Sequence, residues 1–278
     1  MAAQRLWYRL TARGGRRLLL SIVGVALAIG LVTTVTGVSI GLATGSTVYS
    51  EDVDYWIVPE SASTSTMAVS VSGPAFGNVH PTAGEIEDLE DVTRASPVSV
   101  DTVRASSGNT SEYLILVGVI PQPDLTIMGA DTSQLEPGDP YYANGSYNGS
   151  WTGEAMVSPA ASDIMNLSSG ETISVSGSER AFTSHPTSEW GTSGAMGSLP
   201  TVVVHLAEAQ EIADQTGADT ADQFLVQTSD PGVRDTLSGI YPESEVISRA
   251  SGGVQAVSDQ QLPLAMALGG LLIALIVG

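Results

Sequence analysis

Two long uncharged segments bracket a block in which apolar and polar positions alternate over short distances. The first segment covers residues 18–43, and the second covers residues 262–278 at the end of the sequence. At about 1.5 Å per residue, a helix over residues 18–43 reaches about 39 Å, which exceeds a hydrocarbon core of about 30 Å. The pattern therefore predicts a first transmembrane helix at 18–43 and the start of a second, incomplete one at 262–278.

The block between them, residues 46–260, has the short periods of a mixed domain. Runs of Val, Ile and Leu that last only a few residues are typical of strands. Strands are predicted at residues 54–58, 97–103, 113–120, 155–157, 172–176, 201–205, 224–228 and 246–247.

Helix starts are predicted between these strands from their capping residues. Thr82 and Glu85 have the spacing of a capping box, and an apolar stripe of Ile86, Leu89 and Val92 follows. Ser158-Pro159 and Asp230-Pro231 each place a proline directly after an N-cap residue.

A further helix is expected over residues 207–216, with Gly217 as its stop. Ile164, Met165 and Leu167 are expected to face a core. Residues 60–73 are interpreted as a loop or weak strand, residues 137–153 as a loop and residues 183–199 as a second flexible stretch. The fold class is therefore α+β, in one or two small units.

Charge is sorted along the chain and predicts orientation. Residues 1–17 contain Arg5, Arg9, Arg13, Arg16 and Arg17 but no acid, whereas all 30 acidic residues follow the first apolar segment. Basic residues beside a span stay in the cytoplasm. We expect residues 1–17 to form a basic amphipathic segment on the inner membrane surface, or an unstructured tail. Residues 46–260, with a formal charge of about −25, then lie outside the cell membrane.

Arg16 and Arg17 before an apolar run also resemble a twin-arginine export signal. However, residues 18–43 exceed a signal core of about 7–15 residues, and no small-x-small cleavage site follows. An uncleaved anchor is therefore favoured over a signal that is removed.

Glycines recur at every fourth position near the end of the first apolar segment, at Gly37, Gly41 and Gly45. Small residues at this spacing let two helices approach closely in a bilayer. We interpret them as span-packing residues. The alternative is a glycine-rich span without a dedicated partner.

The composition adds a further expectation for the acidic block. The chain has no lysine, and its isoelectric point is about 4.1. An acidic composition without lysine is typical of halophilic proteins, such as those of haloarchaea, because concentrated salt screens the repulsion between the negative charges. A disordered acidic region is the alternative, but the recurring strand-like runs argue against it. The lack of cysteine excludes disulfides and thiolate metal sites.

No catalytic residue, cofactor or metal site is predicted, and no nucleic-acid partner is expected. A phosphate-binding Walker loop needs a lysine. Neither His80 nor His185, which both precede proline, has a partner histidine at zinc-like spacing, and both are interpreted as loop residues. His205 ends an apolar strand and is interpreted as packed or capping. The acidic run Glu85, Glu87, Asp88, Glu90 and Asp91 is interpreted as a solvated helix face.

Four Asn-x-Ser/Thr motifs are candidate N-glycosylation acceptors, at Asn109, Asn144, Asn148 and Asn166. The motif is short and arises by chance in chains rich in Ser and Thr. Four of them within one stretch of the acidic block are consistent with an outward-facing surface.

The order of several motifs resembles that of MacB-like permeases. A span is followed by Asp54-Tyr55-Trp56-Ile57-Val58-Pro59, the stripe at 86–92 and Ser96-Pro97-Val98. Next come Val117-Gly118-Val119-Ile120-Pro121, the stretch from Met156-Val157-Ser158 to Gly170-Glu171-Thr172-Ile173, and residues 201–209. The resemblance covers nearly the whole chain, and the order carries it rather than any single motif.

This resemblance implies an FtsX-like permease subunit of an ABC transporter. Such subunits have four spans, so the sequence is expected to be a fragment that ends in the second. The ectodomain lies between spans one and two and has two subdomains, with the variable inserted one expected near residues 121–200. The implied partners are a separate ABC ATPase, membrane lipid and a second permease, in a homodimer or heterodimer.

The implied activity is to couple ATP hydrolysis by that ATPase to movement of the extracellular domain, for export or mechanotransmission. The chain itself is not expected to be an enzyme. The alternative function is a surface receptor or adhesin, either membrane-anchored or exported, without an ATPase.

Overall fold

The computed structural model describes residues 53–60, 75–187, 190 and 199–248. They belong to one unit, Ser46–Gly278, while the preceding unit, Met1–Gly45, lies outside the described residues. The basic segment 1–17, both expected spans and the glycines at 37, 41 and 45 therefore also lie outside them. Within the described ranges, no helix is long and apolar enough to cross a membrane.

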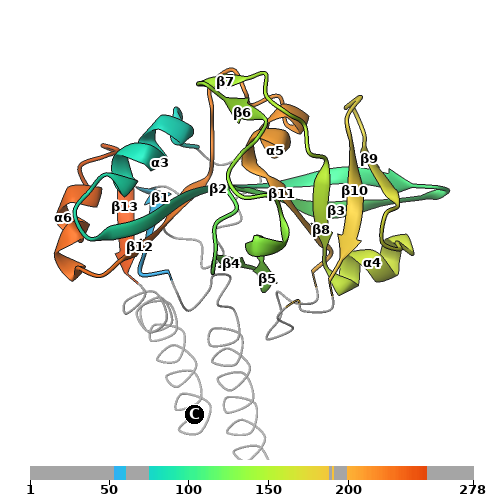
Figure 1. Ribbon diagram of the computed structural model, residues 1–278, viewed down its shortest axis with the longest axis horizontal. Coiled ribbons are helices and arrows are strands. Elements are labelled where there is room, and N and C mark those ends of the chain that lie inside the picture. Colours follow the sequence, from blue (N-terminus) through green and yellow to red (C-terminus); the bar gives the residue numbers. More distant parts are fainter. Residues whose placement is uncertain (1–52, 61–74, 188–189, 191–198, 249–278) are drawn as a thin grey trace, which may run out of the picture. The chain divides into compact units, whose positions relative to one another are not determined.

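Nine strands form one mixed sheet in the order β13-β1-β12-β2-β3-β11-β8-β10-β9 (Figure 1). Its strands are β1 (Tyr55–Pro59), β2 (Val92–Ser107), β3 (Thr110–Val119), β8 (Glu154–Val157), β9 (Thr172–Val175), β10 (Ala181–Pro186), β11 (Thr201–His205), β12 (Gln223–Thr228) and β13 (Ser244–Ser248). Two small hairpins pair β4 (Thr126–Ile127) with β5 (Ala130–Asp131) and β6 (Tyr142–Ala143) with β7 (Ser146–Tyr147).

The α-helices are α3 (Val79–Glu87), α4 (Pro159–Met165), α5 (Leu206–Ile212) and α6 (Arg234–Leu237). The 3-10 helices are η2 (Thr132–Gln134) and η4 (Pro231–Val233). The described part is thus a mixture of helices and strands, as the α+β prediction states.

The longest hairpin joins β2 and β3 and organises half of the sheet. Ser107 pairs with Thr110, so Gly108 and Asn109 alone form the turn, and Gly108 has a φ of 56°. Near this turn, Ala105 and Ser106 of β2 also pair with β9. The strands β2, β3, β11, β8, β10 and β9 therefore close into a ring around their own apolar cluster, which includes Leu114, Val157 and Phe182.

Strand β12 shows how both faces of the other half are buried. Phe224 and Val226 point into a cluster with Val79 and Ile86 of α3. Leu225, between them, joins a second cluster that contains residues of the β4–β5 region. Figure 1 shows α3, α5 and β6–β7 on one side of the sheet and β4–β5 and α4 on the other.

The first and last described strands are neighbours. β1 and β13 pair antiparallel from Tyr55↔Ser248 to Pro59↔Ser244. The chain therefore enters and leaves the sheet on adjacent strands at one edge.

Two predicted helix starts are confirmed. The hydroxyl of Ser158 accepts a hydrogen bond from Ala161 N, with Pro159 in the first turn of α4. Asp230 caps η4 by accepting a hydrogen bond from Gly232 N. In both cases the proline lies in the first turn, where a backbone N–H has no hydrogen-bond partner within the helix, so the N–H that proline lacks breaks no helical hydrogen bond.

The capping box at Thr82 is wrong. Helix α3 begins four residues earlier, after Asn78 in a left-handed conformation, and Thr82 donates its hydroxyl to Asn78 O within the helix. Pro81 fits this earlier start because the first turn of a helix tolerates proline. The stripe is also shorter, because Val92 begins strand β2.

Other boundaries differ as well. α5 ends at Ile212, and Asp214 rather than Gly217 takes the left-handed backbone, with a φ of 58°. Ile164 is 46% exposed and not part of a core, unlike Met165 and Leu167. Residues 183–186 belong to β10 and not to a loop, because β8 supplies their hydrogen-bond partners.

The region expected to be an inserted subdomain, residues 121–200, contributes β4 to β10. Its strands β8, β9 and β10 are hydrogen-bonded into the common sheet. The division into two subdomains stays a prediction, and so do the other domain boundaries.

Candidate functional site

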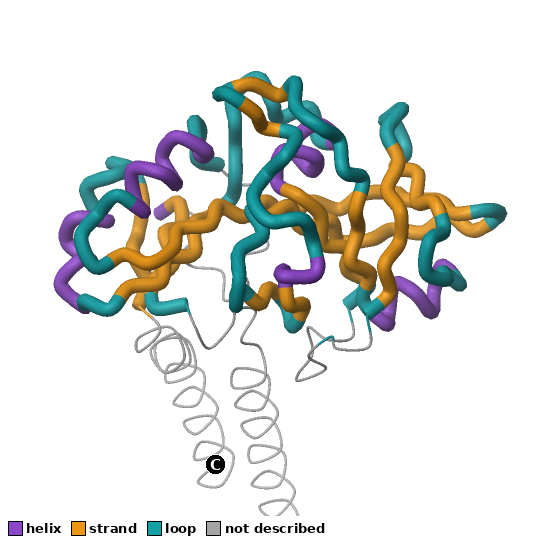
Figure 2. The backbone as a smooth tube through the Cα atoms, in the orientation of Figure 1, coloured by secondary structure: helices purple, strands orange, loops and turns teal. Residues whose placement is uncertain are grey.

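One connection between strands takes part in two buried polar networks of the described unit. We call residues 136–153 the clasp segment. The chain runs from the side of the sheet with β4–β5 to the side with α3 and α5, where the clasp segment contains hairpin β6–β7 (Figure 2). Asn144 and Gly145 form the turn of that hairpin, both with positive φ.

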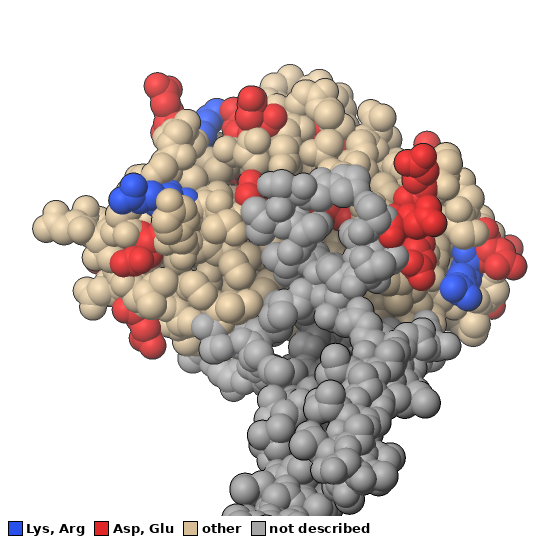
Figure 3. Space-filling view, turned by 180° about the vertical axis from the view of Figure 1, so that it is seen from behind, with Lys and Arg blue, Asp and Glu red and all other residues tan. Residues whose placement is uncertain are grey.

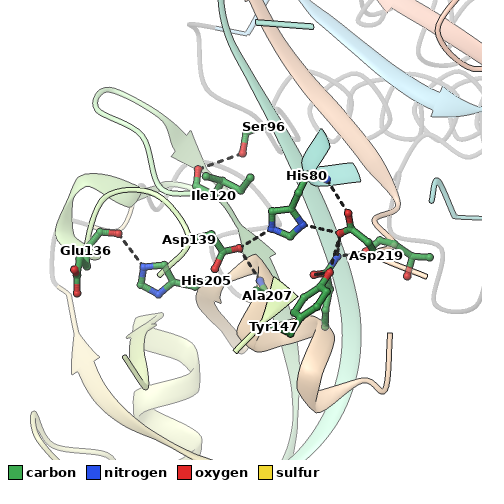
Figure 4. Close-up of polar contacts among 11 residues, drawn as sticks. His80, Ser96, Ile120, Glu136, Asp139, Tyr147, His205, Ala207 and Asp219 are labelled. Atoms are coloured by element: carbon green, nitrogen blue, oxygen red, sulfur yellow. Dashed lines mark hydrogen bonds and ion pairs between the residues drawn. The ribbon is translucent and has the colours of Figure 1, made fainter. Parts of the chain in front are cut away.

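The clasp segment is fastened to α3 by a buried histidine. His80 lies between two carboxylates, with Nε2 3.0 Å from Asp139 Oδ2 and Nδ1 2.6 Å from Asp219 Oδ1 (Figure 4). The side chains of His80 and Asp139 are 5% and 4% exposed. The contact thus joins three places far apart in sequence: α3, the clasp segment and the loop before β12.

Helix α3 places His80 in its first turn. The backbone N–H of His80 donates to Asp219 Oδ2, so this carboxylate holds both the ring and the main chain. Tyr142 of β6 stacks on the imidazole, with ring centroids 3.8 Å apart and planes 14° apart. The ring is therefore fixed at both nitrogens and on one face.

Asp139 and Asp219 are themselves held by other groups. Asp139 Oδ2 also accepts from Ala207 N in the first turn of α5. Asp219 Oδ1 lies 2.8 Å from the hydroxyl of Tyr147, which also lies 2.8 Å from Gln210 Oε1. Asp139 Oδ1 is buried and has no hydrogen-bond partner among the described residues.

The electrostatics favour a cationic imidazole. Burial lowers the pKa of His80, but the hydrogen bonds and charges of Asp139 and Asp219 outweigh it, so the pKa lies above 6.5. Burial raises the pKa of Asp219, yet its hydrogen bond to His80 and the charge on that ring bring the net pKa below 3.8. Burial and Asp219 raise the pKa of Tyr147, which keeps its hydroxyl protonated.

A second buried network fastens both ends of the clasp segment to the start of α5. His205 Nε2 donates to Glu136 O at 2.8 Å, and its Nδ1 lies 3.1 Å from Thr152 Oγ1. Glu208 Oε1 accepts from the backbone N–H groups of Thr152 and Gly153. Burial raises the pKa of Glu208, and its Oε2 has no partner among the described residues.

These networks tie the clasp segment to neighbouring elements. Both ring nitrogens of His80 are occupied by protein groups, and so are both of His205. Within the described ranges, no cluster of three or more His, Asp or Glu residues is arranged to hold a metal ion. What the arrangement can do is bind or release a proton while it ties one segment to two helices.

The predicted site residues lie elsewhere. Asn109 is at the tip of the β2–β3 turn, Asn144 and Asn148 are in the clasp segment, and Asn166 ends α4; all four are exposed. Their glycosylation stays a prediction. The acidic run from Glu85 to Asp91 is exposed, although Glu87 Oε1 also accepts from Ala95 N and Gln122 Nε2.

The interpretation of the histidines is partly wrong. His205 is packed at the start of α5, as expected. His185 lies in β10 and not in a loop, and His80 is a buried helix residue. Pro81 could have indicated a helix start near His80. However, the partners of His80, Asp139 and Asp219, lie 59 and 139 residues away in the sequence, and no local pattern predicts them.

Comparison with solved structures finds similar folds. The periplasmic region of MacB from Actinobacillus actinomycetemcomitans matches 76% of this chain and 92% of its own, with 12% identity and a TM-score of 0.47. The extracellular domain of the ABC-type transporter YknZ from Gram-positive bacteria matches 70% and 99%, with 11% identity and a TM-score of 0.42. No family model matches this chain, and no curated protein does either.

Proposed function

We propose that this chain is a permease subunit of an ABC transporter of the MacB/FtsX type. Its extracytoplasmic domain, residues 46–260, moves when a separate ATPase subunit binds and hydrolyses ATP. The chain itself catalyses no reaction, and its load is a lipid, peptide or protein outside the membrane.

The pairing of β1 with β13 is the observation that supports this proposal most directly. The two strands share a register from Tyr55↔Ser248 to Pro59↔Ser244. The segments that precede β1 and follow β13 are the ones in which the sequence predicts membrane spans. A shift of one span against the other would therefore act on two adjacent, hydrogen-bonded strands.

The sheet provides a continuous path from that edge. β1 also pairs with β12, and β12 pairs with β2, whose 16 residues extend to the ring of strands at the far end. A force applied at β1 and β13 would thus reach the whole sheet through backbone hydrogen bonds. A domain built to transmit movement needs this continuity, whereas a passive anchor does not.

The test is co-purification from the native host. The full-length protein is tagged, extracted in mild detergent and analysed for an associated protein with Walker motifs, and ATP hydrolysis by the purified complex is measured. We expect an ATPase to co-purify and to be stimulated by the permease. If no ATPase associates under any extraction condition, the anchored receptor or adhesin becomes the better explanation.

A glycine variant asks whether span packing contributes. Gly41→Ile places a bulky side chain in the ladder Gly37, Gly41 and Gly45, which should block close helix approach and reduce the recovered permease dimer and ATPase. Ser39→Ile is the matched control, because a residue two positions away lies on the opposite face of a helix. Equal losses in both variants would argue against the glycine face as the packing surface.

A further inference from the structure

We propose that His80 is a proton-dependent fastener, which holds the clasp segment against α3 and α5 when the imidazole is cationic and releases it when the ring loses a proton. This inference concerns the described unit alone and does not depend on the permease function. It rests on the geometry of His80, Asp139 and Asp219.

The geometry requires two ring protons. Nε2 and Nδ1 of His80 both face carboxylate oxygens, at 3.0 Å and 2.6 Å. An ionised carboxylate only accepts hydrogen bonds, and a neutral imidazole has only one N–H to donate. Loss of a proton would therefore place a ring lone pair against a carboxylate oxygen, and one of the two fastening contacts would become repulsive.

Both carboxylates are surrounded by hydrogen-bond donors, as expected for ionised groups. Asp219 receives donors at both oxygens, from the backbone and ring of His80, from Tyr147 and from Gln210 Nε2. Asp139 Oδ2 accepts from His80 and from Ala207 N. The other titratable groups that face His80 are Tyr142, stacked on the ring, and Tyr147, edge-on to it. No second cation among the described residues is paired with Asp139 or Asp219, so the imidazolium is the counter-charge for both.

The direction of the pH effect follows because the fastened state holds the second ring proton of His80 more tightly than the released state does. Burial lowers the pKa of His80 in the folded state, but its two carboxylate partners raise it above the ordinary value on balance. Release of the clasp segment removes one of these partners, Asp139, so the pKa of His80 is lower when the segment is released. The fastening is therefore complete below the pKa of the released state and is lost as the pH rises through the folded pKa. Between these two values, the equilibrium constant for release rises by up to about tenfold per pH unit.

Release would be local rather than global. The clasp segment contributes no strand to the nine-stranded sheet until β8 begins at Glu154. The network of His205 and Glu208 still holds both ends of the segment, at Glu136 and at Thr152 and Gly153. Deprotonation of His80 should thus free the part around β6–β7, including Tyr141 and Tyr142, and leave the sheet intact.

Hydrogen exchange on the full-length chain in lipid nanodiscs tests this. Exchange is followed by mass spectrometry from pH 6 to pH 9 at constant salt, and each rate is divided by the intrinsic chemical rate at that pH. Peptides that cover 139–151 should lose protection as the pH rises, by up to about tenfold per unit. Peptides from β3 should keep theirs, which separates local release from unfolding.

Variants decide whether His80 is the titrating group. His80→Gln should give a protection ratio between 139–151 and β3 that is independent of pH. Asp139→Asn should move the loss of protection to lower pH, because one of the two charges that hold the proton is gone. His185→Gln, at an exposed histidine in β10, should leave the profile as in the wild type.

Two results would overturn the proposal. One is a wild-type protection ratio that stays constant across the pH range, and this result stands even if neither variant folds. The other is a pH dependence that persists in His80→Gln, which would assign the titration to another group such as Glu208.

Discussion

Asp222 is a carboxyl group that the fold holds in an unfavourable place. Its Oδ2 accepts from Val100 N at 2.6 Å, and its own N–H donates to Val98 O, so it joins the start of β12 to β2. Burial is the main cause that raises the pKa of Asp222, the hydrogen bond from Val100 lowers it and the charge of Asp101 raises it, and the net pKa is about 6. At neutral pH the fold therefore keeps an ionised group where the neutral form is preferred.

Replacement of this carboxyl by an amide should stabilise the domain above pH 6. The folded pKa of Asp222 lies above its unfolded value near 3.9, so its stabilising contribution is present below pH 4 and is lost as the pH rises through about 6. Asp222→Asn removes the ionisation and can still accept from Val100 N. We expect a gain of about 1–3 kcal/mol at pH 8 and none at pH 4.

Urea unfolding of residues 46–260 at the two pH values measures this difference. Asp163→Asn, at an exposed aspartate on α4, is the matched control and should change little at either pH. An equal effect of Asp222→Asn at pH 4 and pH 8 would mean that ionisation of Asp222 is not the cause.

At the scale of elements, Gly118 sets how closely α5 approaches the sheet. It lies in β3, where a Cβ atom would come within 2.5 Å of both Ala209 Cβ and Ser99 Oγ and 3.3 Å from Leu206 Cα. The helix can therefore pack directly against the backbone of β3, because Gly118 has no side chain to hold it away. The same helix carries Ala207 and Glu208, which hold the two ends of the clasp segment.

Gly118→Ala should therefore destabilise the domain by about 1–3 kcal/mol, because α5 must shift away from β3. Gly84→Ala is the matched control: no atom lies within 4 Å of the added Cβ, and Gly84 is inside helix α3. That change should stabilise by up to about 1 kcal/mol, since alanine favours helix more than glycine does. Thermal melts of both variants give the comparison. If Gly118→Ala melts no lower than wild type, the close approach of α5 is not needed.

The elements that could be predicted from sequence are those whose signals are local. Ser158-Pro159, Asp230-Pro231 and the run Thr201–His205 each contain their own start or period, and all three appear as predicted. Helix α3 was misplaced because Thr82 and Glu85 imitate a capping box, while the actual start uses a left-handed Asn78 that no pattern marks. The residues of the candidate site were missed for a different reason. Asp139 and Asp219 meet His80 only through the tertiary fold.

At the scale of the whole molecule, the acidic residues that the structure describes have few cationic partners. Among the described arginines, only Arg94 forms an ion pair with a carboxylate, Asp124, at 3.5 Å. Arg180 lies over the rings of Tyr141 and Trp151, Arg104 donates to Ser111 and Arg234 donates to Val246 O. Figure 3 shows several separate acidic patches on the face in view. Self-repulsion should therefore weaken the fold when little salt is present.

The salt dependence of stability tests the halophilic interpretation. The screening length falls from about 10 Å at about 0.1 M salt to about 3 Å at about 1 M. We expect the Tm of residues 46–260 to rise by several degrees between these KCl concentrations, since about 1 kcal/mol shifts Tm by roughly 2–4 °C in a domain of this size.

A charge-reduced variant separates screening from general effects of salt on proteins. Glu85, Asp88 and Glu90 are exposed acids on or next to α3, and replacing them with Gln, Asn and Gln removes three negative charges without changing shape. This variant should melt above the wild type at about 0.1 M KCl and together with it at about 1 M, because screening has then already removed the repulsion. If both proteins gain the same number of degrees, the salt acts through exclusion from the surface or hydrophobic burial instead. The acidic composition would then serve solubility and not the stability of this fold.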